Sequence, residues 1–272
     1  MAEIKSGKTG SLSEPVDDKR LARRIKQHII GKPQRFLAVV QPGFEEVARK
    51  ELKELGITDF DRIIEGGIEF TSRLGECYRI NLASRTLTRL LMRVTSFMAM
   101  HFNTLKDRTS EIPWELYIRS GTHISFQVQS RKSRLFHQER IKEALYKGMS
   151  ARLKEHGIKA GFYDRSDKRA GTEGTQRLFV RFDKDKCRIS LDTSSGFLYK
   201  RGRKKISAMA PLRETLASLI LREAGWPDYD LLIDPMCGSG TFSLEAGEMI
   251  LGRLPNLERE FIFKQWPAFR PA

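Results

Sequence analysis

The stretch RFLAVVQPGFEEVARKELKELGI, residues 35–57, predicts the first unit of the fold. Its opening FLAVV is short and continuously apolar, which is typical of a buried strand, and QPG then favours a turn. In the segment that follows, apolar residues from Phe44 to Leu52 recur at i, i+3, i+4 and i+8, which is one face of a helix. Gly56 ends this helix. The stretch therefore predicts a strand, a turn and an amphipathic helix.

The following residues extend this unit to about residue 99. The segment IIEGGIEFT predicts strand residues around a glycine turn, and LGECYRINLASRTLTRLLMRVTSFMA predicts a helix that leads into another strand. The resulting β-α-β-β-α-β order is that of a small ferredoxin-like domain. We expect this α+β domain to span residues 35–99.

A second α/β segment follows over residues 100–195. FNTLKDRTSEIPWELYI predicts a helix, HISFQVQS alternates as a strand does, and RKSRLFHQERIKEALYKGMSARLKEHGI predicts a long helix with a basic start. LFVRFDKDKCRISLDTS predicts a hairpin with residues 183–186 in its turn. We expect these elements to form a second domain, followed by a basic linker and helix over residues 196–226.

Residues 231–250, LLIDPMCGSGTFSLEAGEMI, have the pattern of a cofactor loop. LLI is apolar without alternation, as a strand buried on both faces should be. Gly238 and Gly240 allow a sharp turn and a close approach of the backbone to a ligand. The helix from about Thr241 would point its free N–H groups at that ligand, outside the carboxyl end of the strand. The pattern predicts a site for a nucleotide-type cofactor.

Two other interpretations of this loop stay open. It could be an ordinary tight turn between a strand and a helix, although two glycines and an acidic strand end favour a ligand site. It could also serve a nicotinamide-dependent enzyme, but Ser243 stands where the dinucleotide fingerprint has its third glycine. A P-loop is excluded because no Gly-Lys-Ser/Thr follows.

The net charge of the chain indicates what kind of partner it binds. The chain has 272 residues, and 49 Lys and Arg against 34 Asp and Glu give a net charge of +15. Such an excess, when clustered, is typical of proteins that bind a polyanion. The alternative is that these side chains only solvate the surface.

Two basic clusters favour RNA phosphate contact. The first lies at the start of a predicted helix and comprises Arg131, Lys132 and Arg134, with His137 as a candidate for base stacking. Phe136 could stack as well, but we expect it in the core. The second cluster is the segment YKRGRKK, with basic residues Lys200, Arg201, Arg203, Lys204 and Lys205. A loop this basic repels itself unless an anion lies nearby.

Other compositional features narrow the class of protein. Cys77, Cys187 and Cys237 are far apart and form no CxxC pair, which argues against a zinc site or a disulfide scaffold and fits a cytoplasmic protein. No apolar run approaches the ~18 residues of a membrane helix. Residues 1–34 are polar and lack the apolar region of a secretory signal, so we expect a mobile basic arm.

Three separate motifs resemble one family. DPMCGSGTFSLEA resembles the first cofactor motif of S-adenosylmethionine (AdoMet)-dependent methyltransferases that act on exocyclic or amide nitrogens of nucleic acids. LYKRGRKKISAMAPLRETLASLIL and SRKSRLFHQERIKEAL resemble, respectively, the segment before that motif and the THUMP core of the RNA guanine-N2 methyltransferases, bacterial large-subunit ribosomal RNA type. FLAVVQPGFEEVARKELKELG resembles their ferredoxin-like segment. The resemblance covers residues 36–272 in colinear order.

The resemblance implies roles for individual residues. Those at the cofactor loop would be Asp234, Cys237, Gly238, Ser239, Gly240 and Thr241. The aspartate, the glycines and the serine would border the methionine end of AdoMet, Thr241 would cap the helix, and Cys237 would be a small loop residue. A catalytic cysteine is the alternative for Cys237, but no motif places a histidine beside it. The family usually has an aromatic residue after KRG, whereas this chain has Arg203, so phosphate contact is the simpler expectation there.

One family motif is absent from the sequence. The family carries (Asn/Asp)-Pro-Pro-(Tyr/Phe), which positions the target base, and this chain contains no Pro-Pro pair. We therefore expect an α+β protein with a ferredoxin-like domain, a THUMP RNA-binding domain over residues 100–195, and the first strand, loop and helix of an incomplete Rossmann-like class I methyltransferase domain over residues 227–272. Such a chain would bind RNA, in the family large-subunit ribosomal RNA, and would transfer little or no methyl group alone. A stand-alone THUMP RNA-binding protein is the alternative.

Overall fold

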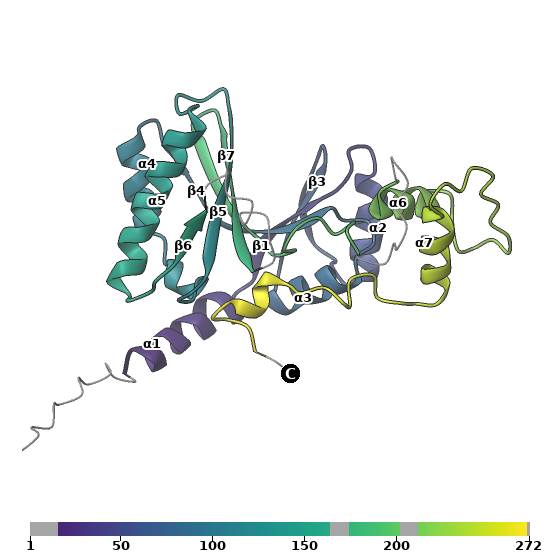
Figure 1. Ribbon diagram of the computed structural model, residues 1–272, viewed down its shortest axis with the longest axis horizontal. Helices are drawn as coiled ribbons and strands as arrows, with labels where there is room; N and C mark the ends of the chain where they lie inside the picture. Colours follow the sequence, from purple (N-terminus) through teal and green to yellow (C-terminus); the bar gives the residue numbers. More distant parts are fainter. Residues whose placement is uncertain (1–15, 164–173, 202–211, 271–272) are drawn as a thin grey trace, which may run out of the picture.

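In the computed structural model, one eight-stranded sheet runs through most of the molecule (Figure 1). The structure describes residues 16–163, 174–201 and 212–270. Neighbouring strands follow the order β2-β3-β1-β4-β8-β7-β5-β6. The strands are β1 (Gln34–Val39), β2 (Phe60–Ile64), β3 (Gly67–Ser72), β4 (Arg89–Met98), β5 (His123–Arg131), β6 (Gly161–Tyr163), β7 (Thr175–Asp183) and β8 (Lys186–Asp192). The α-helices are α1 (Val16–Ile25), α2 (Glu45–Glu54), α3 (Leu74–Ala83), α4 (Phe102–Ser110), α5 (Gln138–Glu155), α6 (Glu214–Glu223) and α7 (Thr241–Ile250).

The first half of the sheet confirms the predicted ferredoxin-like unit. The elements run β1, α2, β2, β3, α3, β4, and the sheet order β2-β3-β1-β4 is antiparallel throughout. Phe36 of β1 lies opposite Phe70 of β3, and their rings stack with centroids 5.6 Å apart. Both side chains are fully buried, as the apolar pattern requires.

The second half continues the same sheet. β5 pairs in parallel with β6 and β7, β7 and β8 form the predicted hairpin, and Lys184 and Asp185 in its turn have φ values of 50° and 63°. β8 then pairs antiparallel with β4, with a bulge between Arg93 and Thr95. The two predicted domains therefore share one sheet.

The described helices pack on one face of this sheet, and none of them covers the other face, which we call the uncovered face. Phe36 and Ala38 of β1, like Leu90 and Met92 of β4, enter one continuous core with residues of α2, α3, α4 and α5. The intervening Leu37 and Leu91 lie outside that core and line a cavity on the opposite side. Figure 1 shows α4 and α5 outside β5 and β7, and α2 beyond β3. The two halves of the sheet consequently face each other across an open side.

The expectation of a mobile arm over residues 1–34 is wrong for residues 16–30. Helix α1 is followed by a π-helical turn, Lys26–Ile30. Both are anchored because Ile25 and Ile29 are buried in the core. Arg24 also pairs with the buried carboxylate of Glu115 at 2.8 Å. Residues 1–15 lie outside the described part of the chain.

The strand predicted at residues 231–233 does not form. Leu231 is 73% exposed and Ile233 is 74% exposed, and no described strand pairs with this segment. An extended segment without a neighbouring strand gains neither ladder hydrogen bonds nor burial, so it stays irregular. The helices on either side nevertheless form, because α6 and α7 pack on each other around Leu221, Trp226 and Ala246.

A buried polar network attaches α6 and α7 to the ferredoxin-like unit. The carboxylate of Glu51 on α2 accepts hydrogen bonds from Ser84 Oγ (2.7 Å), from the backbone N–H of Arg85 (2.8 Å) and from Thr86 Oγ1 (2.5 Å). Arg85 in turn approaches Glu245 on α7 at 3.6 Å. Glu51 therefore holds the loop that presents Arg85 to α7.

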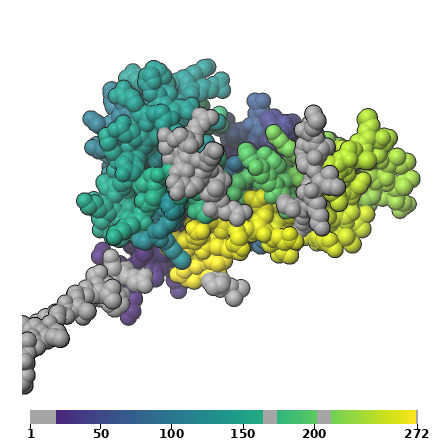
Figure 2. Space-filling model, in the orientation of Figure 1, coloured from purple at the N-terminus to yellow at the C-terminus, as the bar shows by residue number. Residues whose placement is uncertain are grey.

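The segment after α7 ties the C-terminal helices to the rest of the molecule a second time. Figure 2 shows this yellow segment running along the lower edge, from the lobe of α7 towards α1. Phe261, Phe263 and Trp266 enter the main core, and Trp266 Nε1 donates to Gln176 Oε1 on β7 at 2.7 Å. Both units and the C-terminal helices thus form one connected body.

We expect Glu51→Gln to destabilise the fold by about 2–4 kcal/mol, because an amide offers one acceptor where the buried carboxylate receives several donors. The measurement is urea unfolding with linear extrapolation. Glu54→Gln is the matched control on the same helix: Glu54 is exposed and pairs with Arg222, so its loss should cost less than about 1 kcal/mol. Equal losses in the two variants would contradict the role assigned to Glu51.

Candidate functional site

The glycine loop before α7 has the sharp turn that its sequence predicts. Gly238 has a φ of 53° and Gly240 a φ of 67°, both in the left-handed region that favours glycine. The N–H of Gly240 donates to the carbonyl oxygen of Cys237 at 2.7 Å, which closes the turn directly before α7. The first N–H groups of α7 consequently face the loop.

The polar residues of this loop are suited to a ligand with donors and acceptors. The Oδ2 atom of Asp234 is shielded from solvent and has no hydrogen-bond partner among the described residues. Ser239 Oγ and Thr241 Oγ1 lie 3.3 Å apart at the start of the helix, where Thr241 is buried. Cys237 is exposed. The structure thus brings the predicted cofactor residues together at one helix start, although the strand expected before them is absent.

The uncovered face of the sheet is rich in arginine. Strand registers place these residues on one side: Arg35 opposite Arg93, Arg181 opposite Arg188, and Asp183 opposite both Arg131 and Lys186. The basic side chains on this face include Arg35, Arg89, Arg93, Arg131, Arg177, Arg181, Lys186 and Arg188, and the acidic ones include Glu69, Asp183 and Asp192. The face therefore carries a positive excess.

Two of these arginines oppose each other without an ion pair. Arg181 and Arg188 occupy directly opposite positions on β7 and β8, and neither forms a salt bridge with a described residue. Like charges in such a cross-strand pair destabilise a sheet. Burial lowers the pKa of the nearby Arg93, the carboxylate of Glu69 raises it, and these two arginines lower it further. An anion above this face would relieve the repulsion.

Sequence reasoning missed this surface, although a signal was present. In TQRLFVRFD and KCRISLD the basic residues recur at every second position between apolar ones. That period places them on the face opposite the core. The two predicted basic clusters are contiguous runs in a loop and at a helix start. A search for such runs does not find basic residues that alternate with apolar ones along a strand.

The predicted helix-start cluster lies at one end of the same face. Arg131 ends β5 there, and the backbone that follows is held by the β7–β8 turn: the N–H of Arg134 donates to Asp185 Oδ1 at 2.7 Å, and the N–H of Asp185 to Ser133 Oγ at 2.9 Å. The side chains of Arg131, Lys132, Arg134 and His137 are all exposed. The structure thus leaves these four side chains accessible to a partner.

Phe136 corrects an expectation made for this cluster. It is 62% exposed instead of buried in the core, and its ring lies 4.1 Å from that of His137, centroid to centroid. Leu135 takes the buried position because the backbone turns at Lys132, which has a φ of 47°. An exposed aromatic pair beside basic residues is suited to base stacking.

The basic residues of the YKRGRKK segment do not share one environment. Lys200 is exposed, but Arg201 is buried, pairs with Glu245 of α7 and donates to the carbonyl oxygen of Arg85 at 2.9 Å. The prediction that Arg201 contacts phosphate is therefore wrong, because its guanidinium is engaged inside the protein. Arg203, Lys204 and Lys205 lie outside the described residues.

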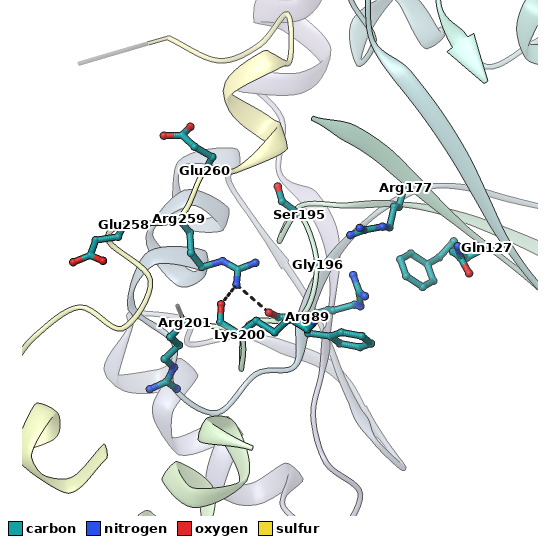
Figure 3. Close-up of a pocket in the computed structure, with 12 residues that line it drawn as sticks. Arg89, Gln127, Arg177, Ser195, Gly196, Lys200, Arg201, Glu258, Arg259 and Glu260 are labelled. Atoms are coloured by element: carbon teal, nitrogen blue, oxygen red, sulfur yellow. Dashed lines mark hydrogen bonds between the residues drawn. The ribbon is translucent and has the colours of Figure 1, made fainter. Parts of the chain in front are cut away.

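A cavity of about 680 Å³ opens beside this linker, between β4, β7 and residues 258–260 (Figure 3). At its base Arg89 forms an ion pair with Asp192 at 2.5 Å, and Arg177 approaches the same oxygen at 3.6 Å. Burial raises the pKa of Asp192, and the two arginines oppose that rise. A second cavity of about 480 Å³ shares Arg89, Phe179 and Phe197 with the first, so the hollow continues along the uncovered face.

Two further properties concern the described residues as a whole. They contain no cluster of three or more His, Cys, Asp or Glu side chains that could hold a metal ion. None of their helices is both long and apolar enough to cross a membrane.

Comparison with known proteins now assigns the chain to a family. Residues 35–91 match the RlmL ferredoxin-like domain, and residues 201–270 match the UPF0020 domain, described as RMKL-like, methyltransferase domain. The chain belongs to the RlmL-like methyltransferase family. The family thus accounts for both the first half of the sheet and the glycine loop.

Relatives of this RlmL-like chain are longer than it is. It is 32% identical, over 84% of its length, to the ribosomal RNA large subunit methyltransferase K/L of Syntrophotalea carbinolica, and it spans 32% of that protein. The solved structures with a TM-score of 0.74 to it include these two. One is a predicted N6-adenine-specific DNA methylase from Listeria monocytogenes, 28% identical, and the other is SMU.472, a putative methyltransferase complexed with SAH, 26% identical. The likeness covers 87% of this chain and 60% of each of theirs.

We expect Gly240→Ala to destabilise this RlmL-like chain by about 1–2 kcal/mol, because alanine is strained at a φ of 67°. Gly247→Ala is the matched control in α7: a β-carbon there would meet no heavy atom within 4 Å, and removing a helical glycine should stabilise by about 0.5–1 kcal/mol. Thermal unfolding of both variants measures these opposite shifts. Stabilisation of both variants would show that the turn at Gly240 is not constrained.

Proposed function

We propose that this chain forms the RNA-binding and first cofactor-contacting part of an AdoMet-dependent methyltransferase. Its substrate would be large-subunit ribosomal RNA, and the acceptor the exocyclic N2 amine of a guanine. The arginine-rich uncovered face is the observation that carries the RNA-binding part. In this proposal residues 100–195 are the THUMP domain, and the protein works in the cytoplasm, consistent with its three unpaired cysteines.

Support for RNA comes from the arrangement of charge. The opposed Arg181 and Arg188 form no salt bridge with a carboxylate of the described residues, and a phosphate backbone would supply negative charge beside them. Lysine and arginine side chains that neutralise phosphates release counterions, which makes such binding strong at low salt. The exposed Phe136 and His137 add rings at the end of this face for unpaired bases. The relative from Syntrophotalea carbinolica is named a ribosomal RNA large subunit methyltransferase, in keeping with this substrate.

Support for AdoMet comes from the glycine loop. Asp234 has a shielded oxygen without a partner among the described residues, and the left-handed Gly240 leaves open space where a side chain would stand. Both features fit a cofactor that offers donor groups and approaches the backbone closely. When bound, AdoMet would supply an electrophilic methyl group. Asp234, Gly238, Ser239 and Gly240 would hold its methionine end, and the structural relative SMU.472 was solved with SAH.

The chemistry at guanine needs more than this loop. An exocyclic guanine amine is a weak nucleophile, so acceptors must hold it in line with the methyl group. The family motif that does this has no counterpart in the 272 residues, which contain no Pro-Pro pair. We therefore propose that this chain alone binds RNA and transfers little methyl group. A stand-alone RNA-binding protein is the second candidate, favoured by the exposed Leu231 and Ile233 where the domain's first strand was expected.

The double variant Arg181→Ala/Arg188→Ala should weaken RNA binding at least tenfold. Its plot of log affinity against log salt should flatten by about 1.5, since about 0.7–0.9 is lost per phosphate contact. Its stability to urea should stay equal or rise, because the like-charge pair is gone. Fluorescence anisotropy with a ribosomal RNA hairpin, from about 50 to 200 mM salt, measures the binding.

The control for this double variant is Lys50→Ala/Lys53→Ala on α2, which removes the same charge from exposed positions on the helix-covered side. It should change affinity less than about twofold. Equal losses in both double variants would mean that net charge, and not this face, binds the RNA. A DNA hairpin of the same sequence tests whether the face prefers RNA.

Equilibrium dialysis with labelled AdoMet tests the cofactor part. We expect measurable binding by the chain, lost in Asp234→Ala, and almost no labelled methyl in guanine-containing RNA. Ser243→Ala, on the exposed side of α7, is the control and should bind as the unaltered chain does. Robust methyl transfer would contradict the proposed dependence on further residues, and no AdoMet binding would favour the stand-alone RNA-binding protein.

A further inference from the structure

Two adjoining hollows flank α1, on a part of the surface that the proposed function does not use. One, of about 370 Å³, lies between α1 and the end of α5, and the other, of about 670 Å³, lies between α1 and the C-terminal segment. The two share Leu21, Glu115 and Ile158, and none of their described lining residues belongs to the uncovered face. The family matches cover residues 35–91 and 201–270, so α1 and α5 also lie outside those matches.

The side chains that line these α1 hollows carry mostly positive charge. Among the described lining residues the acidic one is Glu115, and the basic ones are Lys19, Arg20, Arg24, Arg119, Arg152 and Arg270. Asp17 and Asp18 also belong to α1, and Glu155 lies 4.0 Å from Arg152. Counting these three further carboxylates against the six basic side chains still leaves an excess of positive charge. Hollows lined mainly by one sign of charge concentrate ions of the other sign.

The carboxylate of Glu115 holds two of these arginines in place. Glu115 is 1% exposed, accepts hydrogen bonds from Arg152 Nη2 at 2.7 Å and Nε at 3.1 Å, and pairs with Arg24 at 2.8 Å. Burial raises the pKa of Glu115, but the hydrogen bonds from Arg152 and Arg24 lower it, and the resulting pKa is about 2. Glu115 therefore stays ionised at neutral pH. The two guanidinium groups are thus fixed before a ligand arrives, which reduces the entropy lost on binding.

Other basic side chains of the α1 hollows have no counter-ion of this kind. Lys19, Arg20 and Arg119 are exposed, and none of them forms an ion pair with a described residue. Arg20 stands one helical turn before Arg24, and like charges at this spacing destabilise a helix. An anion in the hollow would relieve this repulsion. Arginine side chains suit a phosphate in particular, because they bind its oxygens with two parallel hydrogen bonds.

The apolar side chains of α1 are not available to a membrane. Leu21 packs against the core and Ile25 is buried in it, which leaves Ala22 as the exposed apolar residue among the described side chains of the helix. A helix that lies in a lipid surface needs an exposed apolar face. The features of α1 therefore favour a soluble polymer of phosphates over a lipid bilayer.

We propose that α1 and the end of α5 form a second RNA contact, in which backbone phosphates lie in the two α1 hollows. One phosphate lies by Arg20 and Arg152, and another lies by Lys19 and Arg119. Contacts to phosphate oxygens position a nucleic acid without reading its sequence. This inference rests on the proposed RNA-binding function and adds a contact apart from the uncovered face.

The double variant Lys19→Ala/Arg20→Ala should weaken RNA binding at least about fivefold. Its plot of log affinity against log salt should flatten by about 1.5, because two phosphate contacts are lost. Filter binding with a transcript of a whole large-subunit ribosomal RNA domain, from about 50 to 200 mM salt, measures both effects. The matched control is Arg23→Ala/Lys26→Ala, which removes the same charge from exposed positions on α1 and the turn after it that line neither hollow. The control should change affinity less than about twofold, and urea unfolding checks that both double variants keep their fold.

Equal losses in the two double variants would overturn the α1 hollows as the site, because the charge of the helix alone would then account for the binding. No loss in Lys19→Ala/Arg20→Ala, with the expected loss in Arg181→Ala/Arg188→Ala, would overturn the second contact and leave the proposed function intact. Sedimentation of the unaltered chain with phosphatidylglycerol vesicles, abolished in Lys19→Ala/Arg20→Ala while RNA affinity is unchanged, would assign the hollows to a membrane surface instead. If the unaltered chain bound no RNA, the proposed function itself would fail, and the second contact with it.

Discussion

The pairing of β4 with β8 is the constraint on which the architecture depends. β4 completes the ferredoxin-like unit, and β8 is the last strand of the second unit, so their backbone hydrogen bonds convert two small sheets into one. A four-stranded sheet with helices on one side would have an edge at β4, and such an edge invites pairing with other chains. Here the second unit covers that edge. The uncovered faces of both units then form one continuous surface.

That continuity explains where the charge is gathered. On either side of the β4–β8 seam, the side chains that alternate with core residues include five arginines: Arg89 and Arg93 on β4, Arg188 on β8, and Arg177 and Arg181 on β7. Each strand alone contributes only one or two of them. The sheet brings them onto one surface, where Arg89 and Arg93 have carboxylate partners and Arg181 and Arg188 lie directly opposite each other.

A second constraint is the placement of carboxylates inside the molecule. Glu51 and Glu245 are each almost fully buried, and each gathers donors from segments far apart in the sequence. Through them the helices α6 and α7 are positioned against the ferredoxin-like unit even though the adjacent segment 231–234 forms no strand. Buried polar contacts therefore hold these two helices in place, whereas elsewhere in the fold the helices are held by packing on the sheet.

The sequence alone determined the order of elements in the ferredoxin-like unit, the β7–β8 turn and the left-handed glycines before α7, because each depends on residues close together in the chain. Local pattern also indicated a basic, nucleic-acid-binding protein and the family of the glycine loop. It misplaced Phe136, Arg201 and residues 231–233. Their burial depends on neighbours that are distant in sequence: the turn at Asp185, the carboxylate of Glu245, and a flanking strand. Only the tertiary structure decided that two units share one sheet and that its arginines form a single face, since a strand's partner and the exposure of its second face are properties of the assembled sheet.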